Sequence, residues 1–342
     1  MQSDEVLSKV TSIGDYAFQG CNSLWDITLP EAATSIGQYA FSSCTSLRSI
    51  NIPESVMSIG NGAFSACNSL TSITIPESVT SIGEEAFFYC RSLTSITIPQ
   101  SVTSIGNDAF SYCLGLTSIA IPLSVKSIGN GAFSYCSGLI SITIPQSVTS
   151  IGDGAFSYCY SLASITIPDL ATIGEGLFNG CTALRNVSLP VNITSTLNFS
   201  DSPNLELIEV KAIIPPPVTS TTFNVGVFGK ATLCVPESSV HFYKQTPIWN
   251  YFYNIVGKDF TTSLKSATVG SSDYTVSYTG GEVWVNVPER AIGKGAVLYS
   301  ASGSPVRGID IASGKTRIST DGLAPGMYIL RMSDGTALRI MR

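Results

Sequence analysis

Ser104–Val125 reads SIGNDAFSYCLGLTSIAIPLSV, and segments closely similar to it recur along much of the chain. The recurrence is clearest in cysteine. Seven cysteines, from Cys21 to Cys159, follow one another at intervals of 23 residues, and Cys181 comes 22 residues after the last of them. A fixed period of this length is typical of proteins built by stacking one repeated unit. The sequence therefore predicts a solenoid in which each unit forms one rung.

Each unit contains one segment with the alternation of a β-strand. Between Leu116 and Ile121 the apolar residues Ile119 and Ile121 are two positions apart, so both face one side of a strand while Ala120 faces the other. Thr117 is also expected to face outward. The next residue in the unit is a proline, which cannot donate to a ladder and so ends the strand. We expect these segments to stack as a parallel β ladder.

The other half of the unit has a different spacing. Ala109, Phe110 and Cys113 stand at positions i, i+1 and i+4, which predicts a short helical turn on the flank opposite the strand. One unit cannot bury this many apolar groups alone, whereas several stacked units can. Eight phenylalanines should then form one internal column: Phe18, Phe41, Phe64, Phe87, Phe110, Phe133, Phe156 and Phe178.

The repeated motif Leu-x-x-Ile-x-Ile-Pro, followed by Val-Thr-Ser-Ile-Gly and Ala-Phe-x-x-Cys, resembles the BspA-like leucine-rich-repeat family. The resemblance covers about residues 10–210, or 10–260 with a looser final part. It implies a bacterial surface or secreted protein associated with adhesion, and it implies no catalytic site. The expected organisation is a leucine-rich-repeat array over 1–210 and an aromatic, degenerate cap over 211–260.

From about Ser263 the composition changes to short strand patterns separated by glycine-rich turns, which predicts a small all-β immunoglobulin-like sandwich over 263–342. The first two strands are expected to form a hairpin around Gly280-Gly281. Leu298-Tyr299-x-x-x-Gly303 and Gly322-Leu323-Ala324-Pro325-Gly326 resemble the C-terminal sorting domains of the bacterial type IX secretion pathway. This resemblance implies an export and anchoring address, or a related sandwich that has lost that role.

Charge and composition argue against several classes of function. Net charge is −6 and no basic cluster is present, so nothing supplies the phosphate neutralisation that nucleic-acid binding needs. No apolar run approaches the length of a membrane span. Met1–Asp4 does not resemble a secretion leader, which fits either a cytoplasmic protein or a mature form. The family resemblance favours the mature form and a secreted or outer-membrane, cell-surface location.

The sequence offers no set of residues typical of catalysis. His241 is the single histidine, and it lies in the expected cap, so we expect no enzyme, no cofactor and no metal site. The row of cysteines lacks the clustered spacing of metal ligands. Cysteines at equivalent positions of neighbouring rungs would point the same way, which strains a disulfide. We therefore predict buried free thiols.

Two sets of residues are candidates for ligand binding. Tyr89, Tyr112, Tyr135 and Tyr158 each precede a ladder cysteine and could form an aromatic strip, or they could merely cover the turn beneath them. A hydroxyl-rich row that includes Thr94, Thr97, Thr117 and Thr143 lies on the outward face of the predicted strands. It could be a hydrogen-bonding floor, or it could reflect only the preference of threonine for strands.

We expect this surface to bind a protein of a host or neighbouring cell. A carbohydrate-binding module and a purely structural spacer are the alternatives, the latter because the rungs are nearly identical. The sequence does not determine the oligomeric state.

Overall fold

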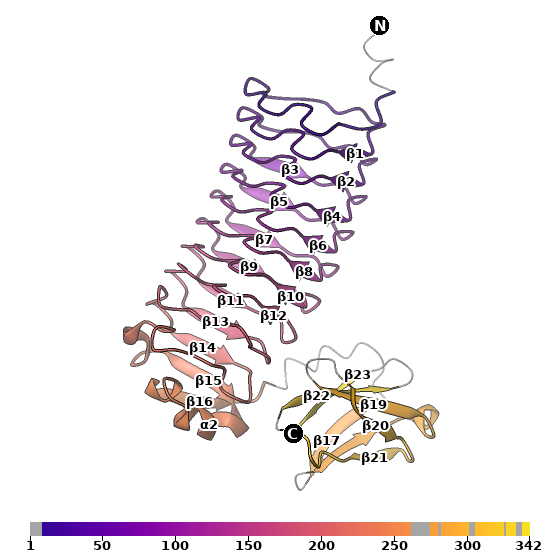
Figure 1. The fold of residues 1–342 in the computed structure, drawn as a ribbon, viewed down its shortest axis with the longest axis vertical. Helices are drawn as coiled ribbons and strands as arrows, with labels where there is room; N and C mark the ends of the chain where they lie inside the picture. The colour runs from indigo at the N-terminus through magenta and orange to yellow at the C-terminus, as the bar shows by residue number, and fades with distance from the viewer. Residues whose placement is uncertain (1–8, 261–273, 280–281, 301–304, 325, 333–336) are drawn as a thin grey trace. The chain divides into compact units, whose positions relative to one another are not determined.

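The computed structural model describes residues 9–260, 274–279, 282–300, 305–324, 326–332 and 337–342. The expectations for Met1–Asp4, Gly280-Gly281, Gly303 and Pro325 lie outside these residues. The chain divides into two compact units, Met1–Gly257 and Lys258–Arg342. In the first unit the chain winds through successive rungs that lie one on another (Figure 1).

Two parallel ladders run along the array, where the sequence predicted one. The expected ladder holds the inward-facing isoleucines, and its strands pair in register, as Ser118–Ala120 does with Ser141–Thr143. Its strands form two consecutive sheets. The first sheet contains β3 Ser72–Thr74 and β5 Ser95–Thr97, and the second contains β7 Ser118–Ala120, β9 Ser141–Thr143, β11 Ser164–Thr166, β13 Asn186–Leu189, β14 Leu207–Val210, β15 Thr232–Pro236 and β16 Asn254–Lys258.

The second ladder is made of the two-residue Ser-Ile or Thr-Ile segments that precede the repeated glycine. Its strands are β1 Ser35–Ile36, β2 Ser58–Ile59, β4 Ser81–Ile82, β6 Ser104–Ile105, β8 Ser127–Ile128, β10 Ser150–Ile151 and β12 Thr172–Ile173. Two residues are too short a run for a periodicity argument, so the strand pattern could not be recognised in the sequence.

The predicted helical turn at Ala109–Cys113 is wrong. Asp108 and Tyr112 have φ values of 50° and 61°, which lie in the left-handed region and interrupt any right-handed helix. The N–H of Phe110 donates to the carbonyl of Ala132 at 2.8 Å, and that of Tyr112 donates to Ser134 at 2.9 Å. This flank is therefore a series of tight turns, and neighbouring rungs supply part of its hydrogen bonding.

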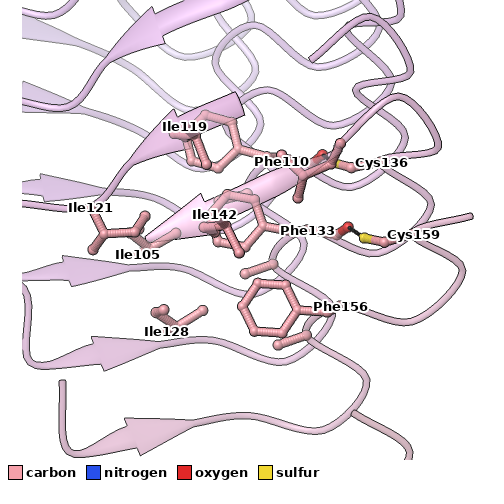
Figure 2. Packing of buried hydrophobic residues seen from close by; sticks show 14 of the residues in the cluster. Ile105, Phe110, Ile119, Ile121, Ile128, Phe133, Cys136, Ile142, Phe156 and Cys159 are labelled. Carbon is pink, nitrogen blue, oxygen red and sulfur yellow. Dashed lines mark hydrogen bonds between the residues drawn. The ribbon is translucent and has the colours of Figure 1, made fainter. Parts of the chain in front are cut away.

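The phenylalanine column forms as predicted and fills the centre of the array. Phe110 is fully buried, and its ring centroid lies 5.4 Å from those of Phe87 and Phe133 (Figure 2). The column also continues beyond the eight expected residues, because Phe199 stacks on Phe178 and Phe223 stacks on Phe199. The irregular spacing of these last two residues hid them in the sequence.

Aromatic residues close the C-terminal end of the array, as the composition suggested. Tyr243, from helix α2 (Val240–Gln245), and Trp249 are fully buried. The Tyr243 hydroxyl donates to the carbonyl of Ala212 at 2.8 Å, and the Trp249 indole N–H donates to Pro216 at 2.9 Å. Three short 3₁₀ turns complete this end: η1 Val225–Val227, η2 Glu237–Ser239 and η3 Trp249–Tyr251.

A buried ion pair joins the last regular rungs to this end. The ammonium of Lys211 lies 2.5 Å from a carboxylate oxygen of Asp169, and the two side chains are 8% and 3% exposed. The backbone N–H of Asp169 donates to the side chain of Gln146 one rung earlier. Because each charge is removed from water, each depends on the other for compensation.

The described residues of the second unit form two antiparallel sheets. The first sheet has the order β17-β18-β21 (Thr275–Thr279, Glu282–Asn286, Lys315–Ile318). The second has the order β20-β19-β22-β23 (Pro305–Asp310, Gly295–Ser300, Met327–Met332, Ala337–Met341). The 3₁₀ turn η5 (Glu289–Ala291) follows β18. Side chains of both sheets, such as Val285 and Leu330, belong to one buried cluster that is separate from that of the array.

Candidate functional site

The four predicted tyrosines form a continuous stack on the turn flank of the array. We call Tyr89, Tyr112, Tyr135 and Tyr158 the tyrosine ladder. Successive ring centroids are 4.3, 4.3 and 4.4 Å apart, closer than the rings of the phenylalanine column. All four side chains are half-buried. The structure therefore brings these residues together as one surface.

The ladder stands at backbone positions that disfavour large side chains. The φ values of its four members lie between 56° and 61°. Glycine occupies the equivalent position at Gly20 and Gly180, with φ values of 72° and 70°. A residue with a Cβ atom in this region costs about 1–2 kcal/mol relative to glycine. Local conformation therefore does not explain the tyrosines, and either their stacking or their function must offset this cost.

Gly180 marks the end of the ladder. A Cβ atom built on it would lie 2.5 Å from Cδ1 of Tyr158, so the Tyr158 ring occupies the space over this glycine. At the other end the guanidinium of Arg91 lies 4.8 Å from the centroid of the Tyr89 ring. Tyr160 meets the edge of Tyr158 with 6.2 Å between centroids. The ring faces are thus largely covered by one another and by these neighbours.

The exposed part of the ladder consists of ring edges and hydroxyl groups. Burial, followed by the neighbouring hydroxyls of Tyr135 and Tyr89, raises the pKa of Tyr112 to about 12. The Tyr112 phenol therefore remains protonated over the physiological range. Protonated hydroxyls can both donate and accept hydrogen bonds, which suits contact with a polypeptide backbone.

The predicted threonines lie on the sheet face, where all four are exposed. Thr94 and Thr117 precede β5 and β7 and belong to one column of the face. Thr97 and Thr143 lie within β5 and β9 in another column, and Ala120 interrupts that column between them. The Thr94 hydroxyl already donates to the carbonyl of Thr71 at 3.1 Å. The threonines therefore form rows across several rungs and do not converge on a single pocket.

Sequence reasoning missed two exposed apolar residues near the tyrosine ladder and these threonines, Leu114 and Ile140, which accompany the exposed Tyr160. Leu114, Ile140 and Tyr160 are 37%, 55% and 44% exposed. Ile140 stands in the column of Thr94 and Thr117, because its N–H donates to the carbonyl of Thr117. The available signal was departure from the consensus, since each of these residues replaces a polar residue found at the same position in other rungs.

The cysteines are free thiols, as predicted, and Cys21 is the one exposed member. Each buried ladder thiol donates to the carbonyl of a phenylalanine in the preceding rung, as Cys136 does to Phe110 at 3.1 Å (Figure 2). Burial raises the pKa of the Cys136 thiol to about 12. A neutral, hydrogen-bonded thiol of this kind acts as a small core residue and is a poor nucleophile.

Other chemistry finds little support in the described part of the chain. His241 is exposed, and its ring lies against that of Phe242 with centroids 3.8 Å apart. Among the described residues, no group of three or more histidine, cysteine or acidic side chains could hold a metal ion. A search of the same residues found no helix with the length and apolar character needed to cross a membrane.

Solved structures with similar repeats come from several bacteria. A leucine-rich repeat protein of T. pallidum is 33% identical over 50% of this chain and 81% of its own, with a TM-score of 0.45. One from Bacteroides ovatus is 30% identical over 68% of each chain, with a TM-score of 0.49. A leucine-rich cell surface protein of Faecalibacterium prausnitzii is 27% identical over 77% of this chain and 87% of its own, with a TM-score of 0.39.

A comparison with curated proteins gives no match. The model of the BspA type leucine-rich repeat region, in contrast, matches six copies over residues 1–117 and 103–223, which together are more than half of the chain. Its repeats coincide with the rungs that carry the phenylalanine column, the cysteine row and the tyrosine ladder. The chain therefore belongs to the BspA-type leucine-rich-repeat family.

Proposed function

We propose that this chain is a surface-exposed or secreted bacterial adhesion protein that binds a protein ligand through the side of its solenoid. Bacterial surface proteins of this family are generally interaction or adhesion proteins. A solenoid also offers an extended surface without needing a pocket. The binding surface consists of the tyrosine ladder and the neighbouring threonine rows.

The tyrosine ladder is the observation that carries this proposal. Four consecutive rungs place tyrosine at a left-handed position where glycine is the least strained residue. The equivalent positions hold glycine at Gly20 and Gly180 and small residues at Ser43 and Ala66. Tyrosine contributes large contact area at interfaces for a small loss of side-chain entropy. A binding interface explains why tyrosine recurs at this left-handed backbone position in four consecutive rungs.

Carbohydrate binding is the second candidate, and the exposed hydroxyl rows favour it. The ladder itself argues against it. Sugar rings usually pack against a free aromatic face, and here each face lies about 4.3–4.4 Å from the next ring. A glycan would therefore have to bind the threonine rows of the sheet. A third possibility, a spacer with no ligand, is supported by the near-identity of the rungs.

A paired substitution separates these candidates. Tyr112→Phe with Tyr135→Phe removes two hydroxyls and keeps the stacked rings, so folding should be unchanged. We expect saturable binding to at least one member of a panel of purified extracellular proteins, weakened about tenfold in the variant because interface hydrogen bonds are lost. Tyr39→Phe is the matched control, since Tyr39 is also a stacked tyrosine at a left-handed position but lies outside the ladder.

The outcomes of this experiment are distinct. Binding on a glycan array that is unaffected by the tyrosine variant would favour the carbohydrate module. A folded protein that binds neither class would favour the spacer. Equal loss of protein binding in the Tyr39→Phe control would remove the ladder from the proposal.

We further propose that the C-terminal unit is an immunoglobulin-like sandwich that serves as a type IX sorting domain. Its two antiparallel sheets with a shared core support the sandwich, and the Leu298-Tyr299 and Gly322-Leu323-Ala324 motifs support the sorting role. Cell fractionation of the full protein and of a variant lacking residues 263–342 tests this role. Retention of the shortened protein inside the cell, with export of the full protein, is the expected result. The same location for both would contradict it.

A further inference from the structure

Charge is divided unequally between the two halves of the central rungs. The first half runs from the ladder cysteine to the strand-ending proline, and in seven consecutive rungs, from Cys44 to Pro190, these halves contain no acidic residue. Their charged residues are Arg48, Arg91 and Arg185. Acidic residues return in the rungs beyond both ends, at Asp26 and Glu206. We call the outward side of these seven halves the acid-free face.

The second halves of the same rungs have the opposite character. Between Glu54 and Gly180 they carry eight acidic residues and one cation, Lys126. The eight are Glu54, Glu77, Glu84, Glu85, Asp108, Asp153, Asp169 and Glu175. The first halves hold the odd-numbered strands β3, β5, β7, β9, β11 and β13, whereas the second halves hold the other ladder and its turns (Figure 1). The division in sequence therefore places opposite charges on different sides of the array. Apart from Asp169, whose carboxylate is buried against Lys211, these acidic side chains are at least partly exposed, so packing of the core does not require this division.

Three exposed apolar residues of the array lie on the acid-free face, and three others, Met57, Leu123 and Leu170, lie in the second halves of their rungs. Arg91 and Arg185 are four rungs apart, which is about 19–20 Å at the usual spacing of parallel strands. Leu114, Ile140 and Tyr160 lie in the three rungs between them and are at least one third exposed. Hydrogen bonds link these rungs in order: Gly115 N–H donates to Arg91, Ala163 N–H to Ile140, and Ala183 N–H to Tyr160.

One carboxylate already occupies this face. Glu206, from the rung after Arg185, forms an ion pair with the Arg185 guanidinium, and both side chains are 56% exposed. This pair shows that the acid-free face can bind a carboxylate at Arg185. Exposed pairs of this kind contribute little free energy, so a carboxylate from another chain can replace Glu206.

We propose that the acid-free face binds an extended acidic segment of a partner protein, lying along the array axis with a carboxylate at Arg91, a carboxylate at Arg185 and apolar side chains over Ile140 and Tyr160. About six extended residues span the distance between the two arginines. This inference rests on the proposed function and specifies the chemistry of the partner. A carboxylate-rich segment is attracted to this face and repelled by the opposite side of the same array. The charge difference therefore selects which side of the array the segment binds.

Fluorescence anisotropy with the full chain tests the inference. The probe is a labelled decapeptide with aspartates at both ends and leucine and phenylalanine in the middle, compared with the same peptide carrying asparagines. At about 0.15 M salt the acidic peptide should bind at least tenfold more tightly than the neutral one. Arg91→Gln and Arg185→Gln should each weaken its binding about threefold to tenfold, and Ile140→Thr, which restores the consensus, should do the same.

Lys126→Gln is the matched control, because it removes the one cation of the acidic halves and leaves the acid-free face unchanged. Equal binding of the two peptides, or equal weakening by Lys126→Gln, would overturn the inference. Sedimentation of the chain alone tests whether a second copy of the chain binds the acid-free face. Self-association that Arg91→Gln abolishes would assign the face to that second copy and would also overturn the inference.

Failure here is distinguishable from failure of the proposed function. If a protein ligand binds the Arg91→Gln and Arg185→Gln variants normally but loses affinity in the Tyr112→Phe, Tyr135→Phe variant, the acid-free face is not its site and the adhesive role stands. If no protein ligand binds the wild-type chain, the proposed function itself fails.

Discussion

Phe110→Ala should be among the most destabilising single substitutions in the array. Phe110 is fully buried and lies between two stacked rings at 5.4 Å, so its removal affects three rungs. Loss of the buried ring costs about 2–3 kcal/mol in transfer free energy. The rigid column cannot fill the space left behind, and the resulting cavity adds about 1–2 kcal/mol. We therefore expect a loss of about 3–5 kcal/mol in the free energy of unfolding.

Phe18→Ala provides the matched comparison. Phe18 stacks on Phe41 in the same column at 5.0 Å, but it is only partly buried. Its removal should cost about 1–2 kcal/mol, since less surface returns to water and less cavity remains. Urea unfolding followed by circular dichroism measures both variants. Amide hydrogen exchange shows whether the loss is confined to nearby rungs, as stability in a repeat array can be local. Equal costs for the two variants, or a cost below about 1 kcal/mol for Phe110→Ala, would refute the shared-column reasoning.

Three further predictions concern contacts seen in the array. Lys211→Ala should destabilise the protein by about 3–5 kcal/mol, because it leaves the Asp169 carboxylate buried without a counter-charge, whereas Asp169→Leu with Lys211→Met should recover most of that loss in thermal unfolding. Gly180→Ala should lower the free energy of unfolding more than Gly20→Ala does. Both glycines have positive φ, but only at Gly180 does the new methyl group meet the Tyr158 ring. Equal melting temperatures of the two variants would contradict this prediction. Burial raises the pKa of Cys90, Cys136 and Cys181 to about 12, so the unfolded chain loses its thiol protons first as pH rises. The stability from these neutral thiols is intact below about pH 8.5 and declines as pH rises from there towards about 12. Urea unfolding across this range should give a shallower decline in Cys136→Ala, and an unchanged slope would argue against the buried thiols.

The candidate site was predictable in part. The tyrosine ladder could be located from the sequence, because a fixed period places equivalent residues on neighbouring rungs. Its left-handed backbone and the covering of its ring faces could not, since both depend on how the turns of adjacent rungs bond to one another. Leu114 and Ile140, which accompany Tyr160, were missed because, in the sequence, each appears as an isolated exception to the consensus. They become one surface only when hydrogen bonds set their rungs side by side.

The amino-acid sequence alone determined the solenoid, the inward isoleucines, the phenylalanine column over its first eight members and the separate β-rich C-terminal region. These features follow from periodic burial, and a period can be read along a chain. Only the tertiary structure decided that Ala109–Cys113 forms turns, that Phe199 and Phe223 extend the column, and that Lys211 meets Asp169 across 42 residues. In each case the deciding partner lies on another rung, and local spacing along the sequence does not identify that partner.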